Sequence, residues 1–426
     1  MATKQAVQKT VLMQKKRKVF FAICSFKHFN IFIFIRRFKI WIFDYFESSK
    51  RKLCLFLFYW VYCDAIVILS TMKIINPIDR FFGLFSHDIG IDLGTANTLV
   101  WVRGRGIVIR EPSAVARHKK TKEILAIGLS AKKMYGRAPS TIEAIRPLRD
   151  GVIADFDATA AMLKHYIRRV HESGTIMPKI PRPRVIVGIP SGVTEVERRA
   201  VADAVRDAGA REVYLIEEPM AAAIGAKLPV EEPEGNLIVD IGGGTSEIAV
   251  ISLGGIVLGR SVRVAGDEMD EAIINYVRLK YSLLLGQPTA ESVKIGIASV
   301  VTDTDSVKQK FTVVRGRDLE TGLPKSIKLT NSEIGEALAP IIQEIIGEIV
   351  DTIEETPPEL TSDIMERGIT LAGGGSLLPG IDKAISEATK MPVWIAEDPL
   401  TCVVRGCGIC LENDSLLKKI RVTKGL

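Results

Sequence analysis

The fold is decided by two stretches with one pattern, Asp88-Ile-Gly-Ile-Asp-Leu-Gly-Thr-Ala-Asn-Thr98 and Leu237-Ile-Val-Asp-Ile-Gly-Gly-Gly-Thr-Ser246. In each, an apolar run that is typical of a buried strand ends in an aspartate, followed by glycines and a hydroxyl residue. Glycine at such a turn lets backbone N–H groups approach a phosphate, because no side chain blocks the way. The aspartate, Asp92 or Asp240, can hold a hydrated Mg²⁺ beside the same phosphates. The repeat predicts two facing hairpins that grip a nucleoside triphosphate.

The charge of the chain is unevenly distributed. Residues 1–71 hold 13 Lys/Arg and 3 Asp/Glu, which leaves 44 basic and 47 acidic residues for positions 72–426. The larger part is therefore mildly acidic and has no basic stripe of the kind that binds nucleic acid. We exclude nucleic acid as the main partner, and the length predicts two or more domains.

The six cysteines do not make a disulfide framework in a chain of this size. Cys402, Cys407 and Cys410 have C-x₄-C-x₂-C spacing without a fourth ligand nearby, whereas structural zinc normally takes four ligands. We interpret them as buried, reduced thiols on a terminal helix, and we expect a cytosolic compartment.

Residues 1–71 differ in composition from the rest, because they hold 11 of the 16 phenylalanines and neither glycine nor proline. Within them, residues 53–69 are apolar except for Asp64, which is near the lower length limit of a membrane span. Three interpretations remain: a signal anchor, a peripheral membrane segment, or a translated upstream region before a natural start at Met72. We favour the last, because so biased a composition without turn signals is not typical of a folded domain.

Two other segments are candidates for contact with a membrane surface. Residues 72–87 are amphipathic, with phenylalanines at helical spacing, and docking onto the body of the protein is the alternative. A proline-containing loop is both apolar and basic at its tip, and burial in a crevice is the alternative there. The candidate membrane residues are Phe81, Phe82 and Phe85 in the first segment and Ile176 and Met177 in the second.

The rest of the chain alternates strand-like and helical runs, which indicates an α/β fold. Thr194-Glu-Val-Glu197 fits a capping box, which makes Glu197 a helix cap on local grounds. A third strand–glycine–helix pattern, at residues 369–380, suits close contact with a base or ribose. Strands are predicted at 88–93, 98–102, 107–110 and 185–190, and helices at 157–172, 218–225, 290–299, 331–355 and about 400–411.

The sequences DLGTANT, VERRA, EEPMAAAIG, DIGGGT and AGGGSLLPG resemble the actin/Hsp70/sugar-kinase superfamily and, within it, the MreB family of bacterial actins. The similarity runs from about residue 72 to residue 420, and residues 1–71 have no counterpart. It implies an α/β, actin-like (ribonuclease H-like) fold of two domains with ATP and Mg²⁺ in the cleft between them. The implied divisions are domain I at 88–235, domain II at 236–399, and a C-terminal helix at 400–426 that returns to domain I.

The resemblance also implies roles for individual residues. Glu197 matches the position that orients the attacking water, and slow hydrolysis is expected because a carboxylate aligns water without stabilising the developing negative charge. Asp92 and Asp240 are the metal-side carboxylates. The implied nucleotide contacts are Thr95, Ala96 and Asn97 in the first hairpin, Gly242, Gly243, Gly244 and Thr245 in the second, Glu291 and Lys294 on a helix, and Gly373, Gly374, Gly375 and Ser376 in the adenosine loop.

That helix departs from the family pattern E-R-x-K-x-E-I-G, because it reads Glu291-Ser-Val-Lys-Ile-Gly-Ile-Ala298. Gly296 stands where the family has a glutamate. A lost hydrogen bond to a buried partner costs roughly 1–3 kcal/mol, so the departure predicts weakened or less selective nucleotide binding.

The function implied by the resemblance is a slow ATPase that polymerises with copies of itself and organises cell-wall synthesis to maintain cell shape. Its expected place is the cytoplasm, peripheral on the inner face of the plasma membrane, with RodZ, MreC and MreD as wall-synthesis partners. A plasmid-partitioning or division-type bacterial actin is the nearest alternative. An Hsp70-type chaperone would need a substrate domain after Gly380, and a small-molecule kinase would need a further aspartate base.

Overall fold

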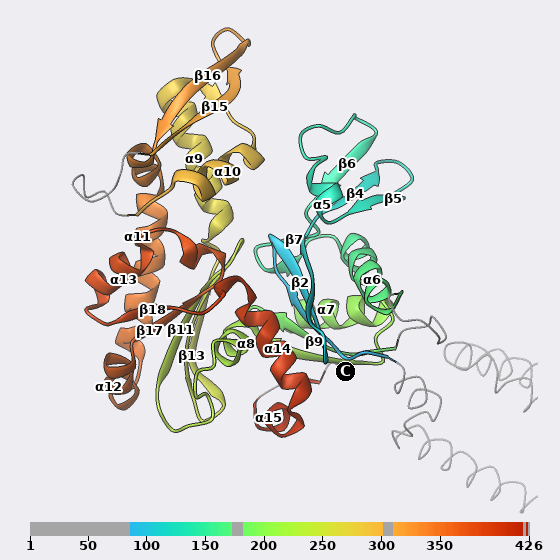
Figure 1. Cartoon of the computed structure of the whole chain (residues 1–426), viewed down its shortest axis with the longest axis vertical. Coiled ribbons are helices and arrows are strands. Elements are labelled where there is room, and N and C mark those ends of the chain that lie inside the picture. The colour runs from blue at the N-terminus through green and yellow to red at the C-terminus, as the bar shows by residue number, and fades with distance from the viewer. Residues whose placement is uncertain (1–85, 173–181, 301–309, 421–422, 425–426) are drawn as a thin grey trace, which may run out of the picture. The chain divides into compact units, whose positions relative to one another are not determined.

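The computed structural model describes residues 86–172, 182–300, 310–420 and 423–424, and its elements are labelled in Figure 1. Its first sheet has the strand order β19-β10-β9-β1-β2-β3. Strand β1 pairs antiparallel with β2 and parallel with β9, so the first hairpin is continuous with a parallel core. The strands are β1 (Ile89–Leu93), β2 (Asn97–Val102), β3 (Gly106–Pro112), β9 (Arg184–Ile189), β10 (Glu212–Glu217) and β19 (Thr423–Lys424).

Helices α6 (Phe156–Glu172) and α7 (Glu195–Asp207) cover one face of this sheet. Successive strand residues point to opposite faces, so Val185 and Val187 of β9 pack with these helices, whereas Ile186 between them packs on the other side. The apolar run at 185–190 is therefore buried on both faces, as a central parallel strand requires.

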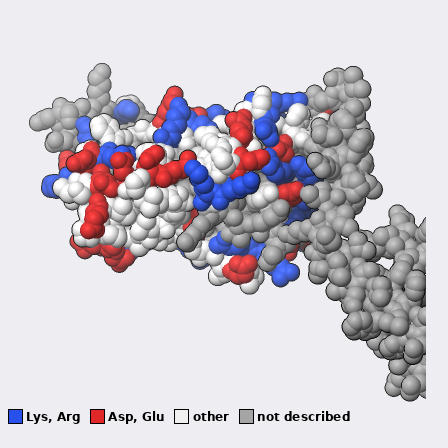
Figure 2. Space-filling view, turned by 90° about the horizontal axis from the view of Figure 1, so that it is seen from below, with Lys and Arg blue, Asp and Glu red and all other residues white. Residues whose placement is uncertain are grey.

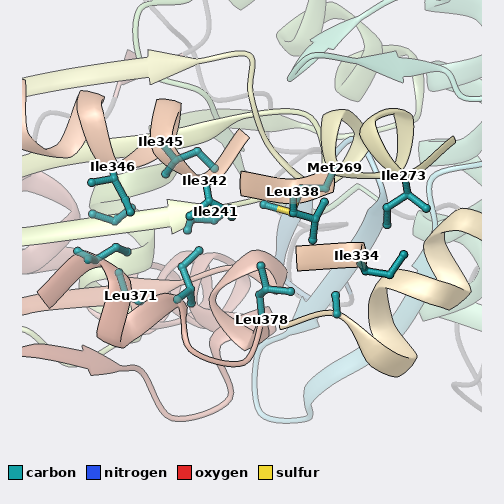
Figure 3. Close-up of a cluster of buried hydrophobic side chains, with 14 of the residues drawn as sticks. Ile241, Met269, Ile273, Ile334, Leu338, Ile342, Ile345, Ile346, Leu371 and Leu378 are labelled. Carbon is teal, nitrogen blue, oxygen red and sulfur yellow. The ribbon is translucent and has the colours of Figure 1, made fainter. Parts of the chain in front are cut away.

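The second sheet has the strand order β13-β12-β11-β17-β18 and repeats the scheme. Helix α11 (Asn331–Glu355) packs against it, and Figure 3 shows Ile342 of α11 beside the strand residue Ile241, with Ile334 of the same helix beside Ile273. The strands are β11 (Asn236–Ile241), β12 (Ser246–Ser252), β13 (Gly255–Val262), β17 (Ile369–Ala372) and β18 (Val393–Ile395). Helices α12 (Pro358–Arg367) and α13 (Ile381–Thr389) also contact this sheet, whereas α9 (Gly266–Tyr281) and α10 (Gln287–Ile297) pack with each other and with strands of a smaller sheet.

Helices α8 (Glu218–Gly225) and α14 (Cys402–Glu412) lie between the two sheets (Figure 1). They approach so closely that a Cβ on Gly225 would lie 1.9 Å from the Cys402 carbonyl oxygen, and one on Gly406 would lie 1.9 Å from that of Ala221. Small residues are therefore a steric requirement here. The cysteines of α14 are buried free thiols, as the sequence indicated.

Two smaller sheets complete the described part. The sheet β5-β4-β6, with the short helix α5 (Leu129–Lys132), belongs to the first sheet's side, and β14-β15-β16 belongs to the second sheet's side. We call these sides the first lobe and the second lobe. The remaining elements are β4 (Val115–His118), β5 (Ile124–Ile127), β6 (Ile142–Ile145), β7 (Leu148–Arg149), β8 (Val152–Ile153), β14 (Leu283–Leu284), β15 (Phe311–Asp318), β16 (Pro324–Thr330), α15 (Asp414–Lys419) and the 3₁₀ turns η1 (Gly374–Leu377) and η2 (Pro399–Thr401).

The α/β prediction is confirmed, and helix 331–355 has its predicted bounds. On the face shown in Figure 2, basic and acidic side chains are interspersed with uncharged ones. Among the described residues, no helix is both long and apolar enough to cross a membrane.

Candidate nucleotide site

A cavity of about 370 Å³ lies between the two lobes, and all three glycine loops line it. This volume falls in the usual range of small-molecule sites. Its wall is made by the turn of the first hairpin, the turn of the second, and the loop after β17. The predicted residues on this wall are Asp92, Thr95, Ala96, Asn97, Asp240, Gly242, Gly243, Gly244, Thr245, Glu291, Lys294, Gly373, Gly374 and Gly375.

The two hairpin turns touch each other. A Cβ on Gly243 would lie 2.6 Å from the Cβ of Ala96, and one on Gly244 would lie 2.8 Å from the Thr95 hydroxyl oxygen. The Thr95 hydroxyl also accepts a hydrogen bond of 3.0 Å from the backbone N–H of Gly151. Only glycine fits between the hairpins, so the backbone of each turn faces the same space.

The third glycine loop, Gly373–Gly375, is also closely packed. Gly373 has φ 77°, in the left-handed region that favours glycine, and a Cβ on Gly375 would lie 2.2 Å from the Ile241 side chain. Ser376 is fully buried and is not part of the cavity wall, and its hydroxyl donates to the Gly373 carbonyl at 2.7 Å. Ser376 therefore shapes the loop from behind.

Three carboxyl groups, those of Asp92, Asp240 and Glu218, gather at the cavity. Burial, and then the charge of Asp240, raises the pKa of Asp92 to about 8, and burial raises that of Asp240 to about 7. Burial, followed by the charges of Glu247, Asp92 and Asp240, raises the pKa of Glu218 well above its usual range. Ionising all three costs free energy unless a cation offsets the charge. No three side chains of the described residues are placed to hold a metal ion together, so the pair Asp92 and Asp240 suits a hydrated Mg²⁺ that takes its remaining ligands from water and phosphate.

Glu197 lies elsewhere. Its carboxylate accepts hydrogen bonds of 2.8 Å from both the backbone N–H and the hydroxyl of Thr194, which is the predicted capping box of α7. These bonds, the backbone one first, lower the pKa of Glu197. It is not among the cavity-lining residues, whereas Glu218 is. Sequence reasoning treated Glu218 only as the first residue of a small-residue helix, although an acid directly before Pro219 at a strand–helix junction is a usable signal.

The second lobe provides the opposite wall. The Lys294 ammonium lies 2.8 Å from a carboxylate oxygen of Asp270 and also donates to the Gly266 carbonyl. Gly296 does not line the cavity, and a Cβ there would meet open space. The expectation that Gly296 weakens nucleotide binding therefore stays a prediction.

The membrane candidates Phe81, Phe82, Phe85, Ile176 and Met177 lie outside the described residues. The structure does describe the residues on the borders of these segments. The backbone N–H of Arg182 donates to the Ser86 hydroxyl at 2.9 Å, and that of His87 donates to Nε2 of His171 at 3.2 Å. The described residues that border the two candidate segments therefore lie next to each other in the first lobe.

Comparisons with known proteins agree with this architecture. Residues 86–419 match the family model described as MreB/Mbl protein. The chain is 53% identical over 337 residues to the cell shape-determining protein MreB of Escherichia coli strain K12, covering 78% of this chain and 95% of the relative. It is 46% identical over 340 residues to the cell shape-determining protein Mbl of Bacillus subtilis, covering 80% and 100%.

Solved structures give the same result. The crystal structure of MreB5 of Spiroplasma citri bound to AMPPNP aligns with a TM-score of 0.72 and 41% identity over 77% of this chain and 96% of that one. The same protein has also been solved bound to ADP. A MamK double helical filament aligns with a TM-score of 0.65 at 22% identity, which shows a shared actin-like fold.

Proposed function

The chain belongs to the MreB/Mbl family, and from this premise we propose that it is a bacterial actin that binds ATP with Mg²⁺, hydrolyses it slowly and polymerises to maintain cell shape. The observation that carries the proposal is the convergence of three glycine loops and two aspartates on one cavity between the lobes. Structures of MreB5 bound to AMPPNP and to ADP support a nucleotide as the ligand.

We assign domain I to residues 88–235, domain II to 236–399, and the returning C-terminal segment to 400–426. The division is supported by the two sheets, since β1–β10 and β11–β18 separate near residue 235. Helix α14 of the C-terminal segment packs against α8, β1 and β9 of the first lobe. The cleft is then the junction between the domains.

The residues of the site suit a phosphate chain. Backbone N–H groups at the turns of Thr95–Asn97 and Gly243–Thr245 bind phosphate oxygens, because the glycines leave them accessible. The Gly242 N–H instead donates to the Thr245 carbonyl at 2.9 Å and closes the second turn. The carboxylates of Asp92 and Asp240 would hold Mg²⁺, which when bound supplies positive charge against the phosphate oxygens. Gly373–Gly375, Glu291 and Lys294 would contact the nucleoside.

For hydrolysis we place the water-orienting carboxylate at Glu218 and leave Glu197 as the helix cap. Glu218 lines the cavity beside Asp92 and Asp240, whereas Glu197 does not line it and its Oε2 accepts both hydrogen bonds from Thr194. Phosphoryl transfer depends mostly on positioning and charge stabilisation. A carboxylate aligns water without stabilising the developing charge, which accounts for a slow reaction.

Association with the inner face of the plasma membrane belongs to the same proposal. The two candidate segments, with Phe81, Phe82 and Phe85 in one and Ile176 and Met177 in the other, border residues that hydrogen bond to each other. Two apolar segments that start from one point are well placed to act together on a lipid surface. The wall-synthesis machinery, including RodZ, MreC and MreD, is the partner class that the family membership implies.

The function is tested by binding and assembly measured together on the full chain. We expect fluorescent mant-ATP to bind with Mg²⁺, and ATP to convert the protein into a sedimentable filament. A chain that binds no nucleotide at any Mg²⁺ concentration contradicts the proposal. A chain that binds but never assembles, with or without anionic vesicles, contradicts its cytoskeletal part.

A further inference from the structure

Two ion pairs join one lobe to the other at the cavity. Lys132, at the end of α5 in the first lobe, places its Nζ 2.7 and 2.8 Å from the two carboxylate oxygens of Glu291 on α10 of the second lobe. Arg146, after β6 in the first lobe, places Nη1 2.6 Å from Oδ1 of Asp267 on α9. Figure 1 shows α5 and α10 on opposite sides of the gap between the lobes.

The acids of these pairs belong to the cavity wall, and Lys132 does not. Glu291, Asp267 and Arg146 line the cavity, so the Arg146 pair lies within the site itself. Lys132 reaches Glu291 from outside the wall and contacts both of its oxygens. It is therefore a cation of the first lobe that fixes the direction of a wall residue of the second.

The second lobe has a cation of its own, and Glu291 does not use it. Lys294 lies one helical turn from Glu291, yet its ammonium pairs with Asp270 and donates to the Gly266 carbonyl. Lys132 is the ion-pair partner that the described residues provide for Glu291. The orientation of Glu291 thus depends on contact between the lobes.

We propose that Lys132 is a positioning residue of the nucleotide site, and that the Lys132–Glu291 pair is a clasp that must open before the nucleotide leaves. The proposal rests on the proposed nucleotide binding. Moving the lobes apart separates Lys132 from Glu291, so release of the ligand has to break this pair. Cleft closure is then coupled to the orientation of a nucleoside-facing carboxylate.

The strength of the clasp follows from its exposure. The Lys132 and Glu291 side chains are 31% and 25% exposed, so solvent and salt weaken the pair without abolishing it. Pairs of this kind contribute modestly, and we expect loss of Lys132 to raise the nucleotide dissociation rate about threefold. The same exposure predicts that added salt raises the dissociation rate of the wild type more than that of a variant without the pair.

The chain offers a matched control. Lys133 is the next residue, is exposed, and has the same charge as Lys132. The experiment loads the full chain with mant-ADP and Mg²⁺ and follows release in stopped flow against excess unlabelled ADP. We expect Lys132→Ala to release about threefold faster, Lys132→Arg to stay near the wild type, and Lys133→Ala to match it.

A double-mutant cycle makes the test specific for the pair, because residues in contact are not additive. In a Glu291→Gln background, Lys132→Ala should add little further acceleration. Equal acceleration by Lys132→Ala and Lys133→Ala, or no acceleration by either, overturns the clasp. A full Lys132→Ala effect in the Glu291→Gln background also overturns it. If the wild-type chain binds no mant-ADP, the proposed function itself has failed.

Discussion

Gly243 and Ala96 face each other across the junction of the two hairpins, and a Cβ on Gly243 would lie 2.6 Å from that of Ala96. The first hairpin belongs to the first sheet and the second hairpin to the second. Contact between these two residues therefore sets how the lobes meet at the phosphate end of the cavity.

Gly243→Ala should force the hairpins apart and weaken mant-ATP binding by about tenfold or more, since overpacking costs 1–3 kcal/mol and 1.4 kcal/mol is tenfold. Gly347→Ala is the control, because it lies in α11 with nothing within 4 Å of the added Cβ. Equal affinity for both variants, measured by fluorescence titration, contradicts the close contact.

Gly225→Ala tests the packing of α8 against α14. The added Cβ would meet the Cys402 carbonyl oxygen at 1.9 Å, and backbone yields less readily than a flexible side chain. We expect the free energy of unfolding to fall by about 2–3 kcal/mol, as measured by denaturant titration with circular dichroism. Gly347→Ala should leave it unchanged or raise it by up to about 1 kcal/mol; similar losses in both would contradict the packing described.

Asp92→Asn tests the electrostatics of the acidic end. The folded-state pKa values of Asp92 and Asp240, about 8 and about 7, exceed those of the unfolded chain, so the native state binds more protons between about pH 4 and 8. The free energy of unfolding of the nucleotide-free protein should therefore fall as pH rises through this window. We expect Asp92→Asn to flatten that fall and to weaken Mg²⁺-dependent mant-ATP binding. An unchanged pH profile would rule out the repulsion.

Gly296→Glu tests whether the glycine at position 296 weakens nucleotide binding. The family pattern predicts that glycine removes a nucleotide contact, whereas Gly296 is not among the residues that line the cavity. We expect a titration with mant-ATP to give the wild-type affinity within twofold, since surface changes usually stay within about 0.5 kcal/mol. A clear gain in affinity would restore the earlier expectation.

The features that the sequence predicts correctly are those specified by residues close together in the chain. Glycine turns after an apolar strand, the Thr194–Glu197 capping box and the helix from Asn331 to Glu355 are each specified by a few neighbouring residues, and the structure contains all of them. The α/β, actin-like class followed from their order and from the family resemblance, and the structural comparisons confirm it.

What the sequence missed depends on residues far apart in the chain. The sequence does not predict the β5-β4-β6 sheet, because its strands are short and half-exposed and form only by pairing with one another. The Lys132–Glu291 pair joins residues of different lobes, so no local pattern reports it. Glu197 and Glu218 are both acids beside a helix start, and no local pattern reports that only Glu218 of the two lines the cavity.

The central claim is tested most directly by phosphate release from ATP in the Glu218→Gln and Glu197→Gln variants, with mant-ATP affinity measured beside it. We expect Glu218→Gln to lower the release rate by about 10²-fold while binding is kept, in the range found when a positioned catalytic group is removed. Glu197→Gln should stay within about twofold, because a cap acts on helix stability. The reverse result, a slow Glu197→Gln beside a normal Glu218→Gln, would contradict the account.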